Sequence, residues 1–273
     1  RDRSVSRGLG DVYKRQVHPF VEYFKFLKQF EDEQTVAKYT IPAPAQMYQQ
    51  MIVPHNIEQT RIFYATDDEL IEDIGKAYQD VIKQFYAAGC RNLQLDDCTW
   101  GAIVGDAAKQ RYQSLGVDIE EVKARLLKVN NLALEGRPED MVITSHICRG
   151  NYHSTFFTSG PYDSVADYVF AQEHVDALLL EYDARSGGFA PLAKVSPDKK
   201  VVLGLITTKK PELEDKDKVI ARIHEAEKYI PLERLCLSPQ CGFASCEIGN
   251  KITEEQQWAK LALVKEIAEE VWK

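Results

Sequence analysis

Four residues of the sequence carry side chains that together could bind a metal ion. His146 and Cys148 stand two positions apart in the apolar segment MVITSHIC. Glu181 lies near the end of DALLLEYD, and Cys241 lies in SPQCGF. Residues two apart on a β-strand point to the same side, so His146 and Cys148 project together if their segment is a strand. One nitrogen, two sulfurs and one carboxylate oxygen form a donor set that suits zinc.

Each of these residues also has an ordinary structural explanation. Buried cysteines often serve as small apolar side chains, and a histidine in a strand is commonly a core residue with its hydrogen bonds satisfied. The metal site is favoured because all four residues fall near the carboxyl ends of predicted strands. Cys98 and Cys246 lie near strand or loop ends as well and are weaker candidates, whereas Cys90 and Cys236 are expected to pack in the core.

Alternating strands and helices are needed to bring these residues together. Six segments have the two-sided apolar pattern of buried parallel strands, and they centre on Tyr39, Leu95, Ile143, Leu179, Leu203 and Leu237. Helical periodicity and capping residues predict helices at residues 18–30, 66–89, 118–136, 164–174, 215–230 and 252–272. Polar residues gather just after the strands, which is where a β/α barrel carries its chemistry.

The sequence therefore predicts an α/β protein with the (β/α)8 TIM-barrel fold. Such a barrel usually has about 250 residues and eight strands. Six strands make it incomplete, and we expect the first two strands to be missing. The alternative is a doubly wound parallel sheet, which would more often carry a glycine-rich turn after its first strand. No such turn is visible in the sequence.

The first sixteen residues differ in character from the rest of the chain. The segment SRGLGDVYKRQ at residues 6–16 is what a transposon-based sequencing adaptor would encode if read in frame; a disordered basic tail is the alternative. We expect residues 1–16 to be a non-native tail that packs against nothing. Residues 17–273 are expected to form a partial TIM-barrel catalytic domain, and the natural chain to continue upstream of Val17.

The composition argues against several classes of function. The 273 residues are 44% hydrophobic and 28% charged, with a net charge of −8, which suits a globular protein without a nucleic-acid partner. No apolar run approaches the roughly 18 residues that a membrane helix needs, and no secretory signal is visible. Six cysteines in so long a chain are typical of metal ligands, nucleophiles or core residues. We expect a cytoplasmic protein that binds small molecules and no membrane.

Four motifs resemble those of the cobalamin-independent methionine synthase family, in particular its short single-barrel relatives. LQLDD at 93–97 is similar to the family's strand ending in Asp-Glu-Pro, and SHIC is similar to its His-x-Cys zinc motif. LLLEYD resembles the strand with its glutamate, and SPQCG resembles its Asn-Pro-x-Cys-Gly. The motifs occur in the family's order, and the resemblance runs from about His18 to the C-terminus.

The resemblance implies a zinc-dependent methyltransferase that forms methionine from homocysteine, with a methyl donor of the 5-methyltetrahydrofolate type. Position by position, it implies four Zn²⁺ ligands: His146, Cys148, Glu181 and Cys241. The amino group of homocysteine would be held by Asp96. Asp97 and Trp100, which follow Asp96 closely in the chain, are expected to line the same substrate site.

The sequence also departs from the family pattern. The family's proton-donating histidine is absent, and GLITTK puts Lys209 in its place, so Lys209 is a candidate catalytic residue. The Gly-Ser motif and the acidic substrate-binding motif of the first two strands are not present, nor is a second barrel. Two other functions stay open. One is zinc-dependent alkyl transfer to another thiol or from a corrinoid protein, and the other is a non-catalytic zinc-binding barrel.

Overall fold

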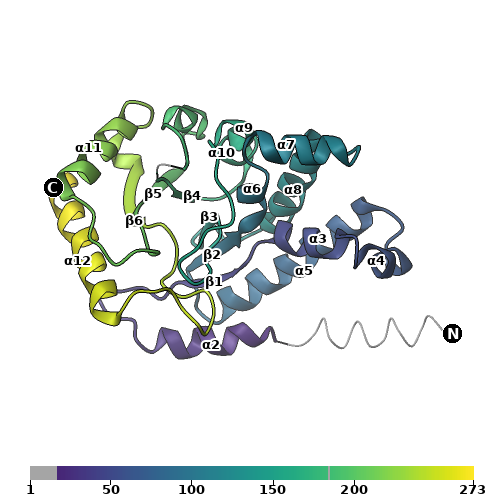
Figure 1. Cartoon of the computed structure of the whole chain (residues 1–273). Coiled ribbons are helices and arrows are strands. Elements are labelled where there is room, and N and C mark those ends of the chain that lie inside the picture. Colours follow the sequence, from purple (N-terminus) through teal and green to yellow (C-terminus); the bar gives the residue numbers. More distant parts are fainter. Residues whose placement is uncertain (1–16, 184) are drawn as a thin grey trace.

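A parallel β-sheet of six strands forms the centre of the protein (Figure 1). The structure is a computed structural model that describes residues 17–183 and 185–273. The strands are β1 (Tyr39–Pro42), β2 (Asn92–Asp97), β3 (Val142–Ile147), β4 (Ala177–Glu181), β5 (Lys200–Ile206) and β6 (Leu235–Pro239). All six predicted strands are confirmed. The prediction that residues 1–16 are a non-native tail lies outside the described residues.

The order of the strands decides between the two predicted folds. Each strand pairs in parallel with the next one in the chain, so the sheet order is β1-β2-β3-β4-β5-β6. A doubly wound sheet reverses its order at a switch point, so that alternative is wrong and the barrel type is confirmed. Within the described part of the chain no strand joins β1 to β6, and the barrel is open there.

Helices connect the strands and lie around the outside of the curved sheet (Figure 1). The long ones are α2 (Pro19–Lys28), α5 (Asp67–Ala87), α8 (Ile119–Leu134), α11 (Lys216–Glu227) and α12 (Glu254–Val271). Thr66 and Thr253 begin α5 and α12 with capping boxes, which satisfy amides that the first turn of a helix leaves unpaired. Five of the six predicted helices are thus present. In the described segments no helix is long and apolar enough to cross a membrane.

The sixth predicted helix, at residues 164–174, is divided into α9 (Asp163–Ala166) and α10 (Val169–Gln172). Tyr168 lies between them with a ψ of −76°, and its amide donates to the carbonyl of Val165, three residues back, so the α-helical pattern stops there. Further short helices, which the sequence did not predict, are α3 (Pro44–Ile52), α4 (Ile57–Phe63), α6 (Cys98–Ala102), α7 (Gly105–Ser114), η1 (Ala190–Lys194) and η2 (Leu232–Arg234).

The two faces of the sheet have different roles. Leu95, Leu178 and Val201 lie in one registered row that also contains Ser145, and all three are fully buried beneath the helices. The next row along the strands points to the inside of the barrel and contains Asp96 and His146. The outer face therefore builds the core, and the inner face carries the polar groups.

Candidate metal centre

The carboxyl ends of the strands bring the four predicted metal ligands to one point. His146 belongs to β3, and Cys148 is the first residue after that strand. Glu181 is the last residue of β4, and Cys241 lies two residues after the end of β6. One ligand atom of each residue lies within 4.8 Å of those of the other three. The predicted convergence is confirmed. We call these residues the metal cluster.

The metal cluster contains buried polar atoms that a metal ion would satisfy. Nε2 of His146 and Oε2 of Glu181 have no hydrogen-bond partner among the described residues. Nε2 of His146 lies 3.9 Å from the other carboxylate oxygen of Glu181. An unpaired buried polar atom costs about 1–3 kcal/mol, so the cluster gains stability from an ion that takes both atoms as ligands. With the two sulfurs, the set fits zinc.

Negative charge in the metal cluster is favoured at the sulfur of Cys148. Hydrogen bonds from the thiols of Cys241 and Cys98 lower the pKa of Cys148, and the amide of Gly150 also donates to this sulfur at 3.4 Å. The same hydrogen bonds raise the pKa values of Cys241 and Cys98. Burial would lower the pKa of His146, but the contact with Cys148 and neighbouring negative charges raise it. The cluster thus favours thiolate, the form of cysteine that binds metals.

Cationic and amide groups surround the carboxylate of Glu181. The amide of Arg149 donates to Oε1 at 2.9 Å, while Oε2 lies 3.6 Å from Nη2 of Arg185 and 3.8 Å from Nζ of Lys209. Burial raises the pKa of Glu181, and the positive charge of Lys209 opposes that rise. The structure therefore places Lys209 beside Glu181, at the edge of the metal cluster.

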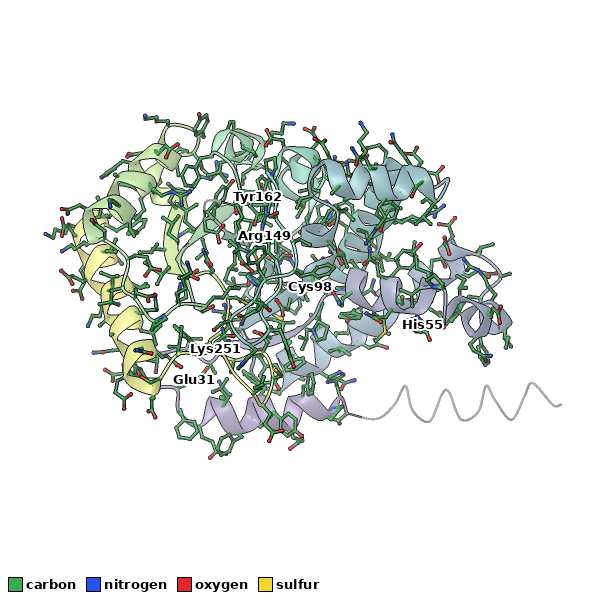
Figure 2. The ribbon with its side chains drawn as sticks, viewed as in Figure 1. Glu31, His55, Cys98, Arg149, Tyr162 and Lys251 are labelled. Carbon is green, nitrogen blue, oxygen red and sulfur yellow. The ribbon has the colours of Figure 1, made fainter. Side chains whose placement is uncertain are left out.

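Arg149 and Tyr162 support the backbone that carries Glu181. The guanidinium of Arg149 lies 4.1 Å from the ring centre of Tyr162, and its Nε donates to the tyrosine hydroxyl at 3.2 Å. That hydroxyl donates to the carbonyl of Glu181 at 3.2 Å. Figure 2 shows Arg149 and Tyr162 next to each other in the interior, with Cys98 nearby. Both side chains are buried, so their contacts fix the end of β4.

Asp96 is the predicted substrate-binding residue that the structure leaves accessible. Its side chain is 41% exposed, and its Oδ1 lies 3.9 Å from Nε2 of His146. With His146 and Cys241 it lines a cavity of about 500 Å³. Burial raises the pKa of Asp96, and the charge of His146 opposes the rise. Asp96 is thus a carboxyl group that faces both the metal cluster and an open cavity.

Asp97 and Trp100, the other two predicted substrate-binding residues, do not line this cavity. Neighbouring residues of a strand point to opposite faces, and because Asp96 points inward, Asp97 points toward the helices. Asp97 is fully buried, and its Oδ2 accepts a hydrogen bond of 2.9 Å from Asn130. Trp100, in α6, is equally buried in the core.

Asn130 joins two buried carboxyl groups behind the metal cluster. Its Nδ2 donates to Asp97 at 2.9 Å and to Glu173 at 2.8 Å, and its Oδ1 accepts from the amide of Ala45 at 2.9 Å. Burial, and then the charge of Asp97, raise the pKa of Glu173 to about 8. Glu173 therefore keeps its proton near neutral pH, so that Asp97 and Glu173 do not both carry a buried negative charge.

Two asparagines, Asn151 and Asn250, tie together the loops that carry the site; we call them the asparagine clasp. Asn151 Nδ2 donates to the carbonyl of Gly242 at 2.7 Å. Asn250 Nδ2 donates to Oδ1 of Asn151 at 2.8 Å and to the carbonyl of Thr208 at 2.9 Å. Gly242 follows one residue of the metal cluster, and Thr208 precedes the candidate catalytic lysine. The clasp thus joins the loops after β3, β5 and β6.

The loop after β3 has a strained backbone that the clasp supports. His153 and Ser154 have φ values of 45° and 65°, in the left-handed region that suits glycine. Oδ1 of Asn250 accepts the amide of Ser154 at 2.8 Å. Such strain persists only where the surroundings impose it. The clasp could not be predicted from the sequence, because nothing in the local sequence shows that these two asparagines meet.

Asn250→Ala is expected to lower zinc affinity about tenfold or more, because the loops bearing the metal cluster lose their common support. A chelator competition titration measures the affinity, and thermal unfolding monitors the fold. Asn131→Ala is the control, since that side chain donates to the carbonyl of Gln172 outside the clasp. Native zinc affinity in Asn250→Ala would contradict a positioning role.

Comparisons with known proteins identify the family of the chain. The family model described as cobalamin-independent synthase, catalytic domain, matches residues 60–270. Two proteins of Bacillus subtilis (strain 168), the uncharacterized proteins YxjG and YxjH, are each 45% identical to the chain. The matches cover 99% and 94% of this chain and 71% and 67% of those proteins. A methionine synthase of Saccharolobus solfataricus is 24% identical over 77% of this chain and 54% of its own length.

Solved structures share the fold. A vitamin-B12-independent methionine-synthase-like protein of Listeria monocytogenes is 36% identical with a TM-score of 0.73, over 94% of this chain and 71% of that chain. A B12-independent methionine synthase of Shewanella sp. W3-18-1 is 21% identical with a TM-score of 0.69, over 94% of this chain and 67% of that one. The strand order, the matched segment and these identities show that the chain belongs to the cobalamin-independent synthase catalytic-domain family.

Proposed function

We propose that the protein is a zinc-dependent methyltransferase that forms methionine from homocysteine, with a methyl donor of the 5-methyltetrahydrofolate type. The observation that carries this proposal is the convergence of a histidine, two cysteines and a glutamate within 4.8 Å, beside a cavity of about 500 Å³. Two comparisons support it. The Saccharolobus relative is a methionine synthase, and the Shewanella structure contains selenomethionine, the selenium analogue of the proposed product.

The chemistry requires a thiolate from a substrate whose thiol is mostly protonated at neutral pH. A zinc ion held by His146, Cys148, Glu181 and Cys241 would supply it, because binding to zinc removes the proton of a thiol. Glu181 is the ligand best placed to give way to a substrate. Its carboxylate has Arg185 and Lys209 within 3.6 and 3.8 Å, and these can pair with it when it moves.

We assign to Lys209 the role of contacting the methyl donor. Its side chain is almost fully buried, and its Nζ has no hydrogen-bond partner in the described segments. An ammonium group in this position can donate a hydrogen bond to the leaving group of the donor as the methyl group departs. Lys209 stands where the family resemblance implies a histidine, so the chain would use a different group for this step.

Asp96 is assigned to the ammonium group of homocysteine, because it is the partly exposed carboxyl group beside His146. Asp96→Asn is expected to weaken homocysteine binding about tenfold, since a neutral amide replaces the carboxylate. The zinc content should stay unchanged. Calorimetric titration of the zinc-loaded chain with homocysteine measures the affinity, and Asp106→Asn, on the exposed side of α7, is the matched control. An unchanged affinity in Asp96→Asn would contradict this assignment.

The function itself is tested by the product. The zinc-loaded chain is incubated with homocysteine and 5-methyltetrahydrofolate, and methionine is measured by mass spectrometry. Methionine that appears only with zinc and both substrates supports the proposal. Zinc binding without methionine formation would contradict it and favour a non-catalytic zinc site. Methylation of another thiol in preference to homocysteine would favour the broader alkyl-transfer alternative.

A further inference from the structure

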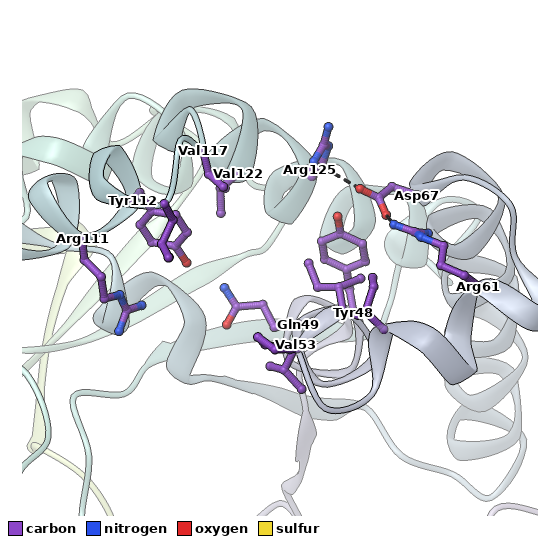
Figure 3. Close-up of a pocket in the computed structure, with 14 residues that line it drawn as sticks. Tyr48, Gln49, Val53, Arg61, Asp67, Arg111, Tyr112, Val117, Val122 and Arg125 are labelled. Atoms are coloured by element: carbon purple, nitrogen blue, oxygen red, sulfur yellow. Dashed lines mark hydrogen bonds and ion pairs between the residues drawn. The ribbon is translucent and has the colours of Figure 1, made fainter.

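A second cavity lies outside the barrel, between the short helices after β1 and β2. It has a volume of about 640 Å³ and is lined by residues of α3, α4, α7 and α8, with Asp67 at the start of α5. Figure 3 shows this cavity, which we call the outer pocket. It shares no lining residue with the cavity of the metal cluster. Its size falls in the range of about 300–1,000 Å³ that small-molecule sites occupy.

The walls of the outer pocket are largely apolar. Val53 comes from the end of α3, and Leu115 and Val117 come from the segment between α7 and α8. Leu115 is 67% exposed and Val117 is 39% exposed. Two aliphatic side chains thus border the pocket without being covered by the chain. Covering them with an apolar ligand group would remove apolar surface from water, which is favourable by about 25 cal/mol per Å².

One end of the outer pocket holds a buried hydroxyl group. Tyr48 is 1% exposed, and its hydroxyl has no hydrogen-bond partner of good geometry among the described residues. Figure 3 shows this hydroxyl directed toward Asp67, which lies between Arg61 and Arg125. Asp67 pairs with Arg61 at 2.5 Å and with Arg125 at 3.2 Å. The carboxylate is thus shared by two arginines, and Arg125 also pairs with Glu121 at 3.4 Å, so the charges at this end of the pocket are balanced.

The other side of the outer pocket carries Arg111. No carboxylate lies within 4.0 Å of its guanidinium in the part of the chain that the structure describes, and its nearest aromatic partner is Tyr112, at 5.3 Å. Figure 3 shows Arg111 and Gln49 directed into the space between the helices. Asp67 and Glu121 balance the other two arginines that line the pocket, so Arg111 supplies one positive charge without a paired carboxylate among the described residues, in a chain whose net charge is −8.

We propose that the outer pocket binds a small amphipathic carboxylate. The apolar part of this ligand lies between Val53 and Val117, and its carboxylate pairs with Arg111. Charge complementarity selects an anion, since a guanidinium pairs with a carboxylate through two parallel hydrogen bonds. The aliphatic walls select a ligand with an apolar body over a small polar anion.

The test uses 4-phenylbutyrate and its neutral counterpart 4-phenylbutan-1-ol as probes, in calorimetric titrations of the full chain. The carboxylate is expected to bind at one site about tenfold more tightly than the alcohol. Arg111→Glu is expected to weaken 4-phenylbutyrate binding by a similar factor. Lys109→Glu is the matched control, because it makes the same charge change at an exposed position of the same helix that does not line the pocket.

A second variant locates the binding site. Val117→Trp adds volume at the partly exposed edge of the outer pocket and should abolish binding while thermal unfolding stays close to that of the native chain. Equal affinity for acid and alcohol would overturn the choice of an anion. Equal losses in Arg111→Glu and Lys109→Glu, unchanged binding in Val117→Trp, or no binding at millimolar probe would overturn the site. None of these results depends on zinc or on methyl transfer.

Discussion

Cys148→Ser and Cys241→Ser are each expected to abolish zinc binding and, with it, methionine formation. A hydroxyl group stays neutral where zinc requires a thiolate, so each variant loses a metal bond and a negative charge. The loss of zinc affinity should exceed the about 10–100-fold typical of residues that only support a metal ligand. Zinc content after dialysis, measured by atomic emission, gives the result.

Cys246→Ser is the control for this experiment. Cys246 is exposed and does not belong to the metal cluster, so its variant should retain the native zinc content. Cys98→Ser distinguishes a hydrogen bond to a metal ligand from a bond to the metal itself. Cys98 hydrogen-bonds to Cys148 without belonging to the cluster, so zinc should remain bound. Full zinc content in either Cys148→Ser or Cys241→Ser would contradict the assignment of that residue as a ligand.

Glu173→Gln is expected to make the protein more stable above neutral pH and to flatten its dependence on pH. The pKa of Glu173 is raised to about 8 by burial and by Asp97, against about 4.3 in an unfolded chain. Between these values the folded state holds a proton that the unfolded state has lost. The free energy of unfolding therefore decreases as pH rises, by at most about 1.4 kcal/mol per pH unit, and levels off above pH 8.

Glutamine removes this dependence because it carries no proton to lose, and its carbonyl can still accept from Asn130. Urea unfolding at pH 5 and pH 8 measures the effect. The variant should gain roughly 1–3 kcal/mol over the native protein at pH 8 and little at pH 5. Glu139→Gln, at an exposed position, should change neither value. Equal pH slopes for Glu173→Gln and the native chain would show that Glu173 titrates normally.

The fold could be predicted from the sequence because its signals are local. The strands around Ile143 and Leu203 are short segments of mostly buried residues set between predicted helices, a pattern typical of a parallel sheet covered by helices. The short helices α3 and α7 escaped prediction because they lie in long loops, where local sequence signals are weak and tertiary contacts dominate. The opening between β1 and β6 follows from counting strands against the eight of a complete barrel.

The site was predicted only in part. His146 and Cys148 were found because their spacing is that of one strand face. Asp96 and Asp97 are adjacent, and the sequence does not show which of them points inward; the pairing of Asp96 with His146 decides it. Asn151 and Asn250 meet across the mouth of the site, 99 residues apart. Such a contact depends on the folded arrangement of loops, for which the sequence has no local pattern.

X-ray absorption at the zinc edge tests the central claim most directly. In the zinc-loaded chain, the claim predicts a first shell of one nitrogen, one oxygen and two sulfur neighbours at about 2.0–2.3 Å. On addition of homocysteine, the sulfur contribution should increase and the oxygen contribution decrease, because the substrate thiolate takes the place of Glu181. A first shell without sulfur would contradict the metal cluster. A shell with two sulfurs that homocysteine leaves unchanged would contradict the proposed methyl transfer.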